Sequence, residues 1–404
     1  MTNRILVVVD AYPWPMRDGY RQRVGHIVEM LARRAEVDLF VVVEPDEATA
    51  ESAEAAARVA ISVVARRSRF VGAAVGLLTG SPRRISQRAW GPARAQLREF
   101  AAGPYDLVWF EHADTYAALR TAVPAGLRAV VDLDNLEDWT LRRSRSAGVA
   151  EGALTLVGGL RSWLGLVLDR IDECRWRRLQ RRIRESAAYV TVCSQSDQRR
   201  LGGPRTMVVP NGYEWNGPAA DLPRPPVLLM VGMFRYAPNL EAARFLGKEV
   251  VPLLRAEYPE AEVRIVGRHD DRLLPLGQIE GLSVIGEVDE ISSELAAARV
   301  AVVPVLSGSG TRIKILEAWA HGLPVVATSI GCDGLAAEDG EHLLVADTPE
   351  EFASACGRLL LDDELWRTIA GGGHRLWNER FRWIRVAEEL DRILDDLGRE
   401  SRTR

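Results

Sequence analysis

The sequence has few lysines, few cysteines and no long apolar run. The shortage of cysteine argues against a disulfide-rich or zinc-binding protein, and the lack of a long apolar run argues against a membrane-spanning one. The four cysteines are scattered and no two have the spacing of metal ligands, so neither a disulfide framework nor a zinc site is expected. No apolar run is long enough to span a bilayer. The apolar segment near the N-terminus, residues 5–9, is too short for a secretory signal, so we expect a cytoplasmic protein.

The balance of charge argues against a general nucleic-acid binder. The chain carries 52 basic and 56 acidic residues, a formal net charge of −4. With 47% hydrophobic residues and a mean hydropathy of −0.08, it has the composition of an ordinary globular protein. Its 404 residues are more than one hydrophobic core usually organises, which predicts two domains.

Short apolar segments alternate with helical segments in the first half of the chain. This alternation predicts a parallel sheet with helices on both faces. We expect strands at 5–9, 37–43, 63–64, 107–110, 129–133, 189–193 and 207–209, and helices at 23–34, 48–59, 93–101, 115–122 and 160–185.

The same alternation restarts after a stretch rich in proline and small residues, 218–226, which is typical of a linker. We expect strands at 227–231, 262–266, 282–285 and 300–305, and helices at 240–256, 291–297, 349–361, 364–371 and 383–397. The fold class predicted is α/β, with two doubly wound, Rossmann-like domains facing across a cleft.

The most informative segment is Ser307-Gly-Ser-Gly-Thr311-Arg-Ile-Lys314-Ile-Leu-Glu317, a glycine-rich loop that leads from a strand into a helix. Unpaired N–H groups at a helix N-terminus bind phosphates, and Lys314 stands in the first turn. Only one other lysine, Lys248, occurs among the 52 basic residues. Glu317 follows on the same face, where a carboxylate can bind a diol. Such loops also cap helices without any ligand, so both interpretations stay open at this point.

Several motifs taken together resemble the family-four retaining glycosyltransferases, and within them the exopolysaccharide-type sugar transferases. The motifs are Pro210-Asn211-Gly212, Gly232 with Pro238-Asn239, Gly267-Arg268, Gly286 and the block through Lys314 and Glu317. The resemblance implies the GT-B fold, with an acceptor-side domain at 1–215, a nucleotide-sugar domain at 216–380, and a final helix and tail at 381–404 that cross back to the first domain. It also implies a metal-independent enzyme without a cofactor, whose donor substrate is a nucleotide-diphosphate sugar.

The resemblance also implies a donor site in the second domain. Lys314 would hold the diphosphate, Gly310 and Thr311 would offer backbone N–H groups, and Glu317 would contact the ribose. Ser309 stands where the family has another glutamate. Gly232 and Asn239 would line the site, and Arg235 or Arg268 would supply a second cation, although either arginine is equally consistent with a solvated surface.

In the first domain, the resemblance places Gly19 and Arg23 near the donor phosphates. It suggests His112, which follows a strand, as a catalytic or substrate-contacting residue in addition to Lys314 and Arg235, although a lone histidine is also commonly structural or simply exposed. Asn135 and Glu137 would bind acceptor hydroxyls, but Asn135 is also a common helix-capping residue.

Residues 154–184 run from an apolar part to a part rich in arginine, and this suggests two alternatives. One is peripheral contact with the inner face of a membrane, which suits a lipid-linked acceptor. The other is a long helix packed on the first domain, with its arginines solvated or paired.

The function expected is sugar transfer to a glycan, a lipid-linked glycan or a small-molecule acceptor. The alternatives are a nucleotide-sugar epimerase of the same architecture and a non-catalytic sugar-nucleotide binder, the latter suggested by Ser309.

Overall fold

The computed structural model describes residues 4–16, 18–45, 56–143, 156–222, 224–268, 271–307 and 312–402. The chain divides into two compact units. Unit 1 comprises Met1–Pro210 and Ala387–Arg404, and unit 2 comprises Asn211–Val386. Residues 211–215 and 381–386 therefore belong to unit 2, outside the range 216–380 given to that domain by the sequence. Among the described residues, no helix combines the length and apolar character needed to cross a membrane.

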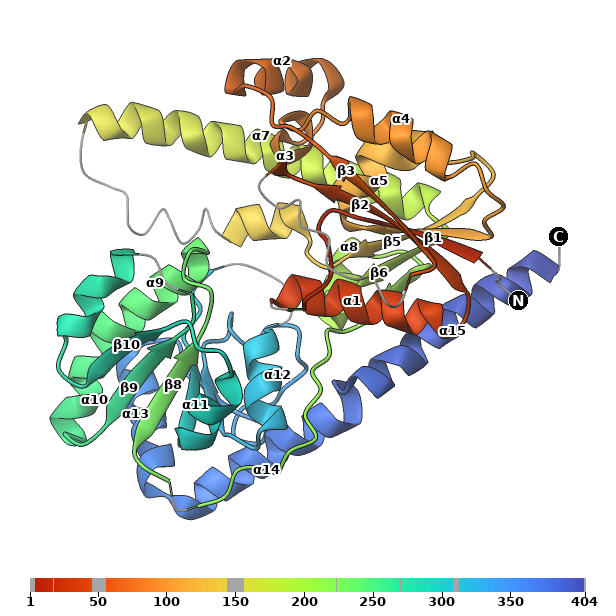
Figure 1. The fold of residues 1–404 in the computed structure, drawn as a ribbon. Helices are drawn as coiled ribbons and strands as arrows, with labels where there is room; N and C mark the ends of the chain where they lie inside the picture. Colours follow the sequence, from red (N-terminus) through yellow and green to blue (C-terminus); the bar gives the residue numbers. More distant parts are fainter. Residues whose placement is uncertain are drawn as a thin grey trace. The chain divides into compact units, whose positions relative to one another are not determined.

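Unit 1 is built on a seven-stranded parallel sheet with the order β3-β2-β1-β4-β5-β6-β7 (Figure 1). The strands are β1 (Arg4–Val9), β2 (Glu36–Val43), β3 (Arg58–Val63), β4 (Leu107–Glu111), β5 (Arg128–Leu133), β6 (Tyr189–Val192) and β7 (Thr206–Val208). The predicted apolar segments form the central strands, because a parallel sheet covered on both faces buries nearly every side chain along them.

Four of the five helices predicted in unit 1 are present with shifted ends, and three observed helices, at residues 69–79, 83–86 and 195–201, were not predicted. The helices of unit 1 are α1 (Gly19–Ala32), α2 (Arg69–Thr79), α3 (Arg83–Ser86), α4 (Gly91–Phe100), α5 (His112–Leu119), η2 (Arg120–Ala122), α7 (Leu156–Ser186), α8 (Gln195–Leu201) and the C-terminal part of α15 (Trp383–Arg402). The helix expected at 48–59 is wrong at its end, since Arg58 and Val59 pair with β2 as part of β3. Tertiary pairing overrides the helix propensity there; residues 46–55 lie outside the described part. Helix α2 was not predicted.

Unit 2 has a six-stranded parallel sheet with the order β10-β9-β8-β11-β12-β13. The strands are β8 (Val227–Val231), β9 (Glu262–Val266), β10 (Leu282–Gly286), β11 (Val300–Val303), β12 (Val325–Ala327) and β13 (Leu344–Val345). The helices are α9 (Ala237–Phe245), η3 (Leu246–Val250), α10 (Val251–Glu257), η4 (Asp271–Gln278), α11 (Ile291–Ala297), α12 (Ile313–Ala320), α13 (Pro349–Leu361), α14 (Asp363–Arg380) and the start of α15.

The helix predicted at 240–256 is divided by a π-helical segment, Leu246–Val250. Pro252 follows this segment, and a proline lacks the N–H that an α-helix needs and clashes with the carbonyl four residues earlier. A local change to π-helical hydrogen bonding accommodates both effects.

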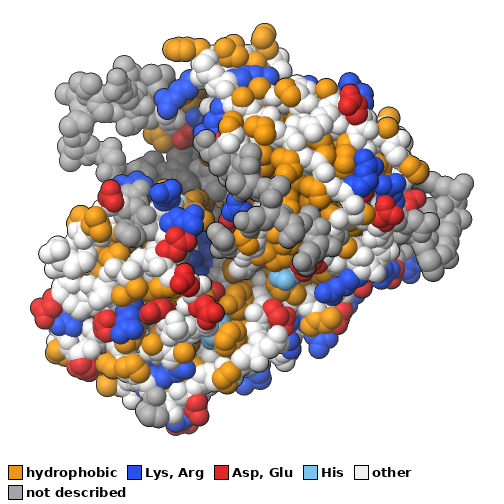
Figure 2. Space-filling view, viewed as in Figure 1, with side chains coloured by type: hydrophobic (Ala, Val, Ile, Leu, Met, Phe, Trp, Pro, Cys, Tyr) orange, Lys and Arg blue, Asp and Glu red, His pale blue; other side chains and the backbone are white. Residues whose placement is uncertain are grey.

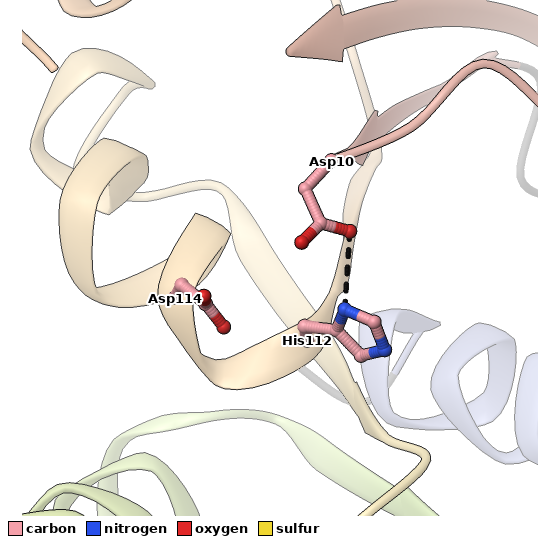
Figure 3. Close-up of side chains that lie close together, drawn as sticks. All are labelled: Asp10, His112 and Asp114. Atoms are coloured by element: carbon pink, nitrogen blue, oxygen red, sulfur yellow. Dashed lines mark hydrogen bonds and ion pairs between the residues drawn. The ribbon is translucent and has the colours of Figure 1, made fainter. Parts of the chain in front are cut away.

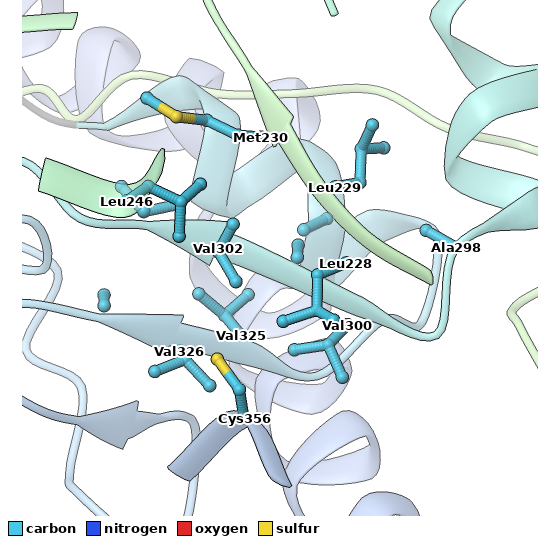
Figure 4. Packing of buried hydrophobic residues seen from close by; sticks show 14 of the residues in the cluster. Leu228, Leu229, Met230, Leu246, Ala298, Val300, Val302, Val325, Val326 and Cys356 are labelled. Atoms are coloured by element: carbon cyan, nitrogen blue, oxygen red, sulfur yellow. The ribbon is translucent and has the colours of Figure 1, made fainter. Parts of the chain in front are cut away.

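Each unit has its own hydrophobic core. In unit 2, Leu228, Val300 and Val326 come from three adjacent strands and pack with Cys356 of α13 (Figure 4). These side chains are almost completely buried, which accounts for the uninterrupted apolar strands in the sequence. Cys356 and Cys193 are buried free thiols, whereas Cys174 is exposed and Cys332 is half-buried.

In both sheets the strand order reverses direction at one point, between β1 and β4 in unit 1 and between β8 and β11 in unit 2. In doubly wound sheets, ligands bind beyond the carboxyl ends of the strands at such a reversal. The residues that follow β1, β4, β8 and β11 are therefore the expected ligand-binding residues of the two sheets.

Candidate functional site

The site in unit 2 begins where β8 ends, at Gly232. A Cβ added to Gly232 would lie 3.3 Å from the Asn239 side chain and 3.5 Å from Lys314 Nζ. Gly232 follows β8, Asn239 belongs to α9, and Lys314 is the second residue of α12, which follows β11. The sheet thus brings together three residues that the sequence assigned to one donor site.

Lys314 is held in place by Asn239. Its Nζ donates a hydrogen bond of 2.8 Å to Asn239 Oδ1, and Asn239 Nδ2 donates one of 3.0 Å to the Met233 carbonyl. Burial, together with the positive charge of Arg312, lowers the pKa of Lys314 to about 7, although Glu317 opposes the change. Among the described residues, the hydrogen-bond acceptor of Lys314 is a neutral amide, so the ammonium can gain a negatively charged ligand.

Glu317 lies one turn after Lys314 on the same side of α12. Burial raises its pKa to about 7, against the opposing effects of a hydrogen bond from the Tyr213 hydroxyl and of the Lys314 charge. The pKa of Tyr213 is raised by its own burial and by Glu317. A carboxylate that already accepts one hydroxyl can accept others, which is the chemistry of diol binding.

The backbone is unusually close-packed beside Lys314. Gly267 has φ +132°, and a Cβ there would lie 2.0 Å from the Gly232 carbonyl oxygen. The Gly267 N–H donates a 2.7 Å hydrogen bond to the Gly286 carbonyl. Gly232, Gly267 and Gly286, which follow the three predicted strands 227–231, 262–266 and 282–285, therefore meet at one edge of the sheet. Only glycine fits at position 267.

The two arginines predicted for the donor site in unit 2, Arg235 and Arg268, both lie on the surface. Arg268 is exposed and forms a two-point ion pair with Glu287, at 2.8 and 3.1 Å, so its guanidinium is already engaged. Arg235 is exposed. Ser309, Gly310 and Thr311 lie outside the described residues.

Unit 1 has a second cluster of polar residues at its own reversal point. Asp10 follows β1, and His112, which follows β4, places Nδ1 3.0 Å from Asp10 Oδ1 (Figure 3). Tyr20 of α1 stacks on the imidazole at 4.8 Å between centroids and donates a hydrogen bond to the same Asp10 oxygen. His112 has φ +68°, a strained conformation for a residue with a side chain, and such strain is concentrated at functional sites.

His112 is an imidazolium at neutral pH. Burial lowers its pKa, but the ion pair and hydrogen bond with Asp10 overcome this and raise the pKa to about 10. Burial likewise raises the pKa of Asp10, and the His112 charge lowers it to a final value below the usual range. His112 therefore provides a fixed positive charge and is not a general base in this state.

The ligand atoms of Asp10, His112 and Asp114 lie within 4.8 Å of one another, a separation that suits a metal ion. However, Arg84 donates to both oxygens of Asp114 at 2.7 Å, and Arg88 lies 3.7 Å from Asp10. These arginines already neutralise the carboxylates and repel a cation. The cluster is an ion-pair network, and its donor set does not fit a metal ion.

The predicted acceptor residues lie beside this network. Glu137 accepts a 2.7 Å hydrogen bond from Arg84, and its pKa is raised by burial even though Arg84 lowers it. Asn135 Nδ2 lies 3.3 Å from Asp134 Oδ2.

Arg23 differs from the prediction that it faces a phosphate. It is completely buried, and its Nε and one terminal nitrogen donate to the two oxygens of Asp132 at 2.7 and 2.8 Å, while the other terminal nitrogen donates to the Val209 carbonyl at 3.0 Å. A buried guanidinium must be paired, and Asp132 provides that pairing. Gly19 is the first residue of α1, which therefore begins four residues before the predicted range 23–34. The N-cap residue Asp18 accepts a hydrogen bond from the Arg21 N–H.

Sequence reasoning missed Asp10, Arg84 and Tyr213. Asp10 had a usable signal, because it directly follows a buried strand. Arg84 and Tyr213 had no such signal, because their partners lie far away in the sequence: Asp114 and Glu137 for Arg84, and Glu317 for Tyr213.

Solved structures with similar folds cover almost the whole chain. Sucrose-phosphate synthase from Thermosynechococcus elongatus superimposes with a TM-score of 0.69 at 19% identity, covering 98% of this chain and 100% of that one. HepE of Anabaena, in complex with UDP and glucose, has a TM-score of 0.62 at 17% identity and covers 96% and 99%. Together with two Rossmann-like units, these neighbours confirm the predicted GT-B fold class.

The family assignment rests on the second unit. Residues 225–362 match the family model described as "Glycosyl transferases group 1". This match is consistent with the resemblance seen in the motifs of the same segment.

Curated relatives match over part of their length. The phosphatidyl-myo-inositol mannosyltransferase of Mycobacterium leprae (strain TN) is 30% identical over 158 residues, which are 37% of this chain and 42% of that protein. The D-inositol 3-phosphate glycosyltransferase of Corynebacterium jeikeium is 34% identical over 111 residues, 27% and 26% of the two chains. The matched region thus spans less than half of these relatives.

Proposed function

We propose that the protein is a glycosyltransferase that moves a sugar from a nucleotide-diphosphate sugar to an acceptor with retention of configuration. The observation that carries the proposal is Lys314, a partly buried ammonium in the first turn of α12 whose hydrogen-bond partner is the neutral amide of Asn239. The matched family and the names of the relatives favour a transferase over the epimerase and the non-catalytic binder.

In this proposal Lys314 stabilises the leaving diphosphate. Negative charge develops on a phosphate oxygen as the glycosidic bond breaks, and a positioned cation together with helix N–H groups stabilises that charge without a metal ion. Gly232 and Gly267 allow the diphosphate to approach the backbone closely. Arg235, which is exposed beyond β8, and the amides of Gly310 and Thr311 are further candidates for contact with the donor.

Glu317 is proposed to bind the ribose hydroxyls. Its carboxylate lies beside the ammonium of Lys314 and accepts from Tyr213, so the geometry supports a diol next to a diphosphate. HepE is described in complex with UDP-glucose, which supports a nucleotide sugar as the donor here.

At the reversal point of unit 1, we propose that the His112 imidazolium contacts a substrate hydroxyl or phosphate. Asn135 and Glu137 remain candidates for acceptor contacts. The names of the relatives suggest including inositol phosphates and phosphatidylinositol among the acceptors. A cytoplasmic location with peripheral membrane contact is part of this proposal.

A two-stage experiment tests the proposal. Thermal unfolding is first followed with UDP-, GDP-, TDP- and ADP-sugars, because a ligand that binds the native state raises its apparent stability. The donor that stabilises the protein is then incubated with and without the acceptor panel. Acceptor-dependent release of the nucleoside diphosphate supports transfer; a new sugar nucleotide formed without acceptor identifies an epimerase, and binding without turnover identifies a non-catalytic binder.

A further inference from the structure

Helix α2, Arg69–Thr79, turns its large apolar side chains outward. Phe70 is 90% exposed, Leu78 88%, Leu77 77% and Val71 51%. Residues seven apart in a helix lie on the same side, so Phe70 aligns with Leu77 and Val71 with Leu78. The four side chains form one continuous apolar surface.

The opposite side of α2 holds it on the rest of unit 1 and consists of glycine. Gly72 and Gly76 are its buried residues. A Cβ on Gly72 would lie 3.0 Å from the Gln87 side chain, and a Cβ on Gly76 would lie 3.1 Å from Ser86 and 3.4 Å from Arg175. A surface helix of a globular protein normally packs its apolar face inward. In α2 this arrangement is reversed, so packing within the unit does not explain its apolar residues.

The chain segment that contains α2 carries only positive charges, although acidic residues from other segments, such as Asp169 of α7 and Glu44, pair with some of its arginines. Residues 56–98 contain nine arginines and no aspartate or glutamate, in a chain whose net charge is −4. Arg69, the first residue of α2, is exposed, and the Arg66 side chain is 73% exposed although it also pairs with Glu44. Figure 2 shows hydrophobic side chains over α2 at the upper edge of the view, with basic side chains beside them.

Helix α7 extends the apolar surface. Leu168 is 49% exposed and Ile171 43%. They precede Arg175 by seven and four residues and so lie on the same side of α7 as the residue beside Gly76.

The arginine-rich end of α7 is engaged within unit 1. Arg177 pairs with Glu173 at 2.6 Å and with Asp138 at 3.4 Å. Arg184 donates to the Leu201 carbonyl at 2.8 Å. Part of the arginine-rich end of the segment 154–184, which the sequence suggested for membrane contact, is therefore paired within unit 1. The large apolar side chains of α2, in contrast, are exposed.

We propose that α2 docks into the headgroup region of an anionic membrane, with Phe70, Leu77 and Leu78 inserted and the flanking arginines at the lipid phosphates. An exposed apolar surface with exposed arginines, Arg66 and Arg69, at one end matches an anionic lipid surface in both polarity and charge. At 11 residues, α2 is too short to span a bilayer and would lie in its plane. This inference gives a site for the peripheral membrane contact included in the proposed function, and it does not depend on the sugar-transfer reaction.

Flotation of the full chain with lipid vesicles tests the inference. We expect binding to vesicles of phosphatidylcholine containing about 30 mol % phosphatidylglycerol, and little binding to phosphatidylcholine alone. The double variant Leu77→Ser/Leu78→Ser should lower the partition coefficient by at least about tenfold, since two exposed leucines no longer insert. The matched control Leu274→Ser/Leu361→Ser changes two leucines of unit 2 that are 52% and 68% exposed, and should bind like the wild type.

Far-UV circular dichroism and thermal unfolding should be the same for all three proteins, because the altered side chains are exposed. Equal flotation of the α2 variant and the wild type overturns the inference, and so does equal binding to neutral and anionic vesicles. A wild-type dimer that the α2 variant converts to monomer, without vesicle binding by either, assigns the surface to a second copy instead.

Discussion

The Lys314 ammonium donates a 2.8 Å hydrogen bond to Asn239 Oδ1, although the two residues are 75 positions apart in the chain. Lys314 is the second residue of the helix after β11, and Asn239 lies in the helix after β8. These two strands are neighbours at the point where the strand order of unit 2 reverses. The pair positions a cation beside close-packed glycines, where a phosphate can approach.

Lys314→Ala is expected to abolish transfer while the fold is retained. Removal of one preorganised group that stabilises developing charge typically costs about a hundredfold or more in turnover. Lys248→Ala is the matched control, because Lys248 is the only other lysine and is exposed. Turnover is measured with the donor identified by thermal shift, and the fold by circular dichroism. Wild-type turnover in Lys314→Ala would remove the phosphate role from this residue.

Binding of a nucleoside diphosphate should take up protons near neutral pH. The pKa of Lys314 is about 7 and that of Glu317 is also about 7, so as the pH falls through 7 the lysine becomes charged and the glutamate becomes neutral. Both changes favour an anion, and affinity should therefore fall as the pH rises. Isothermal titration calorimetry at constant pH, in buffers of different ionisation enthalpy, measures the uptake, and Lys314→Met should reduce it. Equal proton uptake by wild type and variant contradicts the assignment to Lys314.

The His112–Asp10 pair should stabilise the protein in a pH-dependent way. The pKa of His112 is about 10 in the folded protein, above the usual histidine value of 6.5. Its contribution is therefore complete below pH 6.5 and is lost as the pH rises through 10. We expect the difference in unfolding free energy between wild type and His112→Gln, measured with urea, to shrink across this range. In Asp10→Asn, the imidazole should titrate at a lower pH by NMR; an unchanged titration would rule out the pair as the cause.

Arg23→Met should destabilise the protein by about 3–5 kcal/mol, because it leaves Asp132 buried and unpaired. Arg21→Met, two positions away, removes a half-buried pair with Asp18 that solvent still reaches, and should cost about 1 kcal/mol or less. Urea unfolding measures both. A folded Arg23→Met protein with wild-type stability and weakened donor binding would restore the phosphate contact that the sequence predicted.

Gly267→Ala should cost more than about 2 kcal/mol, since a Cβ would clash with the Gly232 carbonyl and φ is positive. Gly277→Ala is the control, because its Cβ would meet nothing closer than 4.0 Å. Equal unfolding free energies for the two variants would show that the close approach of the strand ends is dispensable.

The predicted elements were most accurate where the local pattern and the tertiary environment agree. The strands β1, β8 and β9 lie within a residue of their predicted ranges, because a strand buried on both faces must be a continuous apolar run. Helix α2 was missed because its apolar and glycine faces are reversed relative to an ordinary surface helix. Strand β3 was predicted only at its end, as 63–64, because edge pairing overrides the local helix propensity at its start.

The amino-acid sequence by itself determined the two α/β halves and the placement of Lys314 and Glu317 on one face of a helix, since both follow from periodicity within a short segment. Only the tertiary structure decided that Arg23 pairs with Asp132, 109 positions away, and that His112 meets Asp10, 102 positions away. Those contacts depend on the order in which strands assemble in the sheet. Local patterns do not encode that order, because every buried parallel strand has the same apolar character.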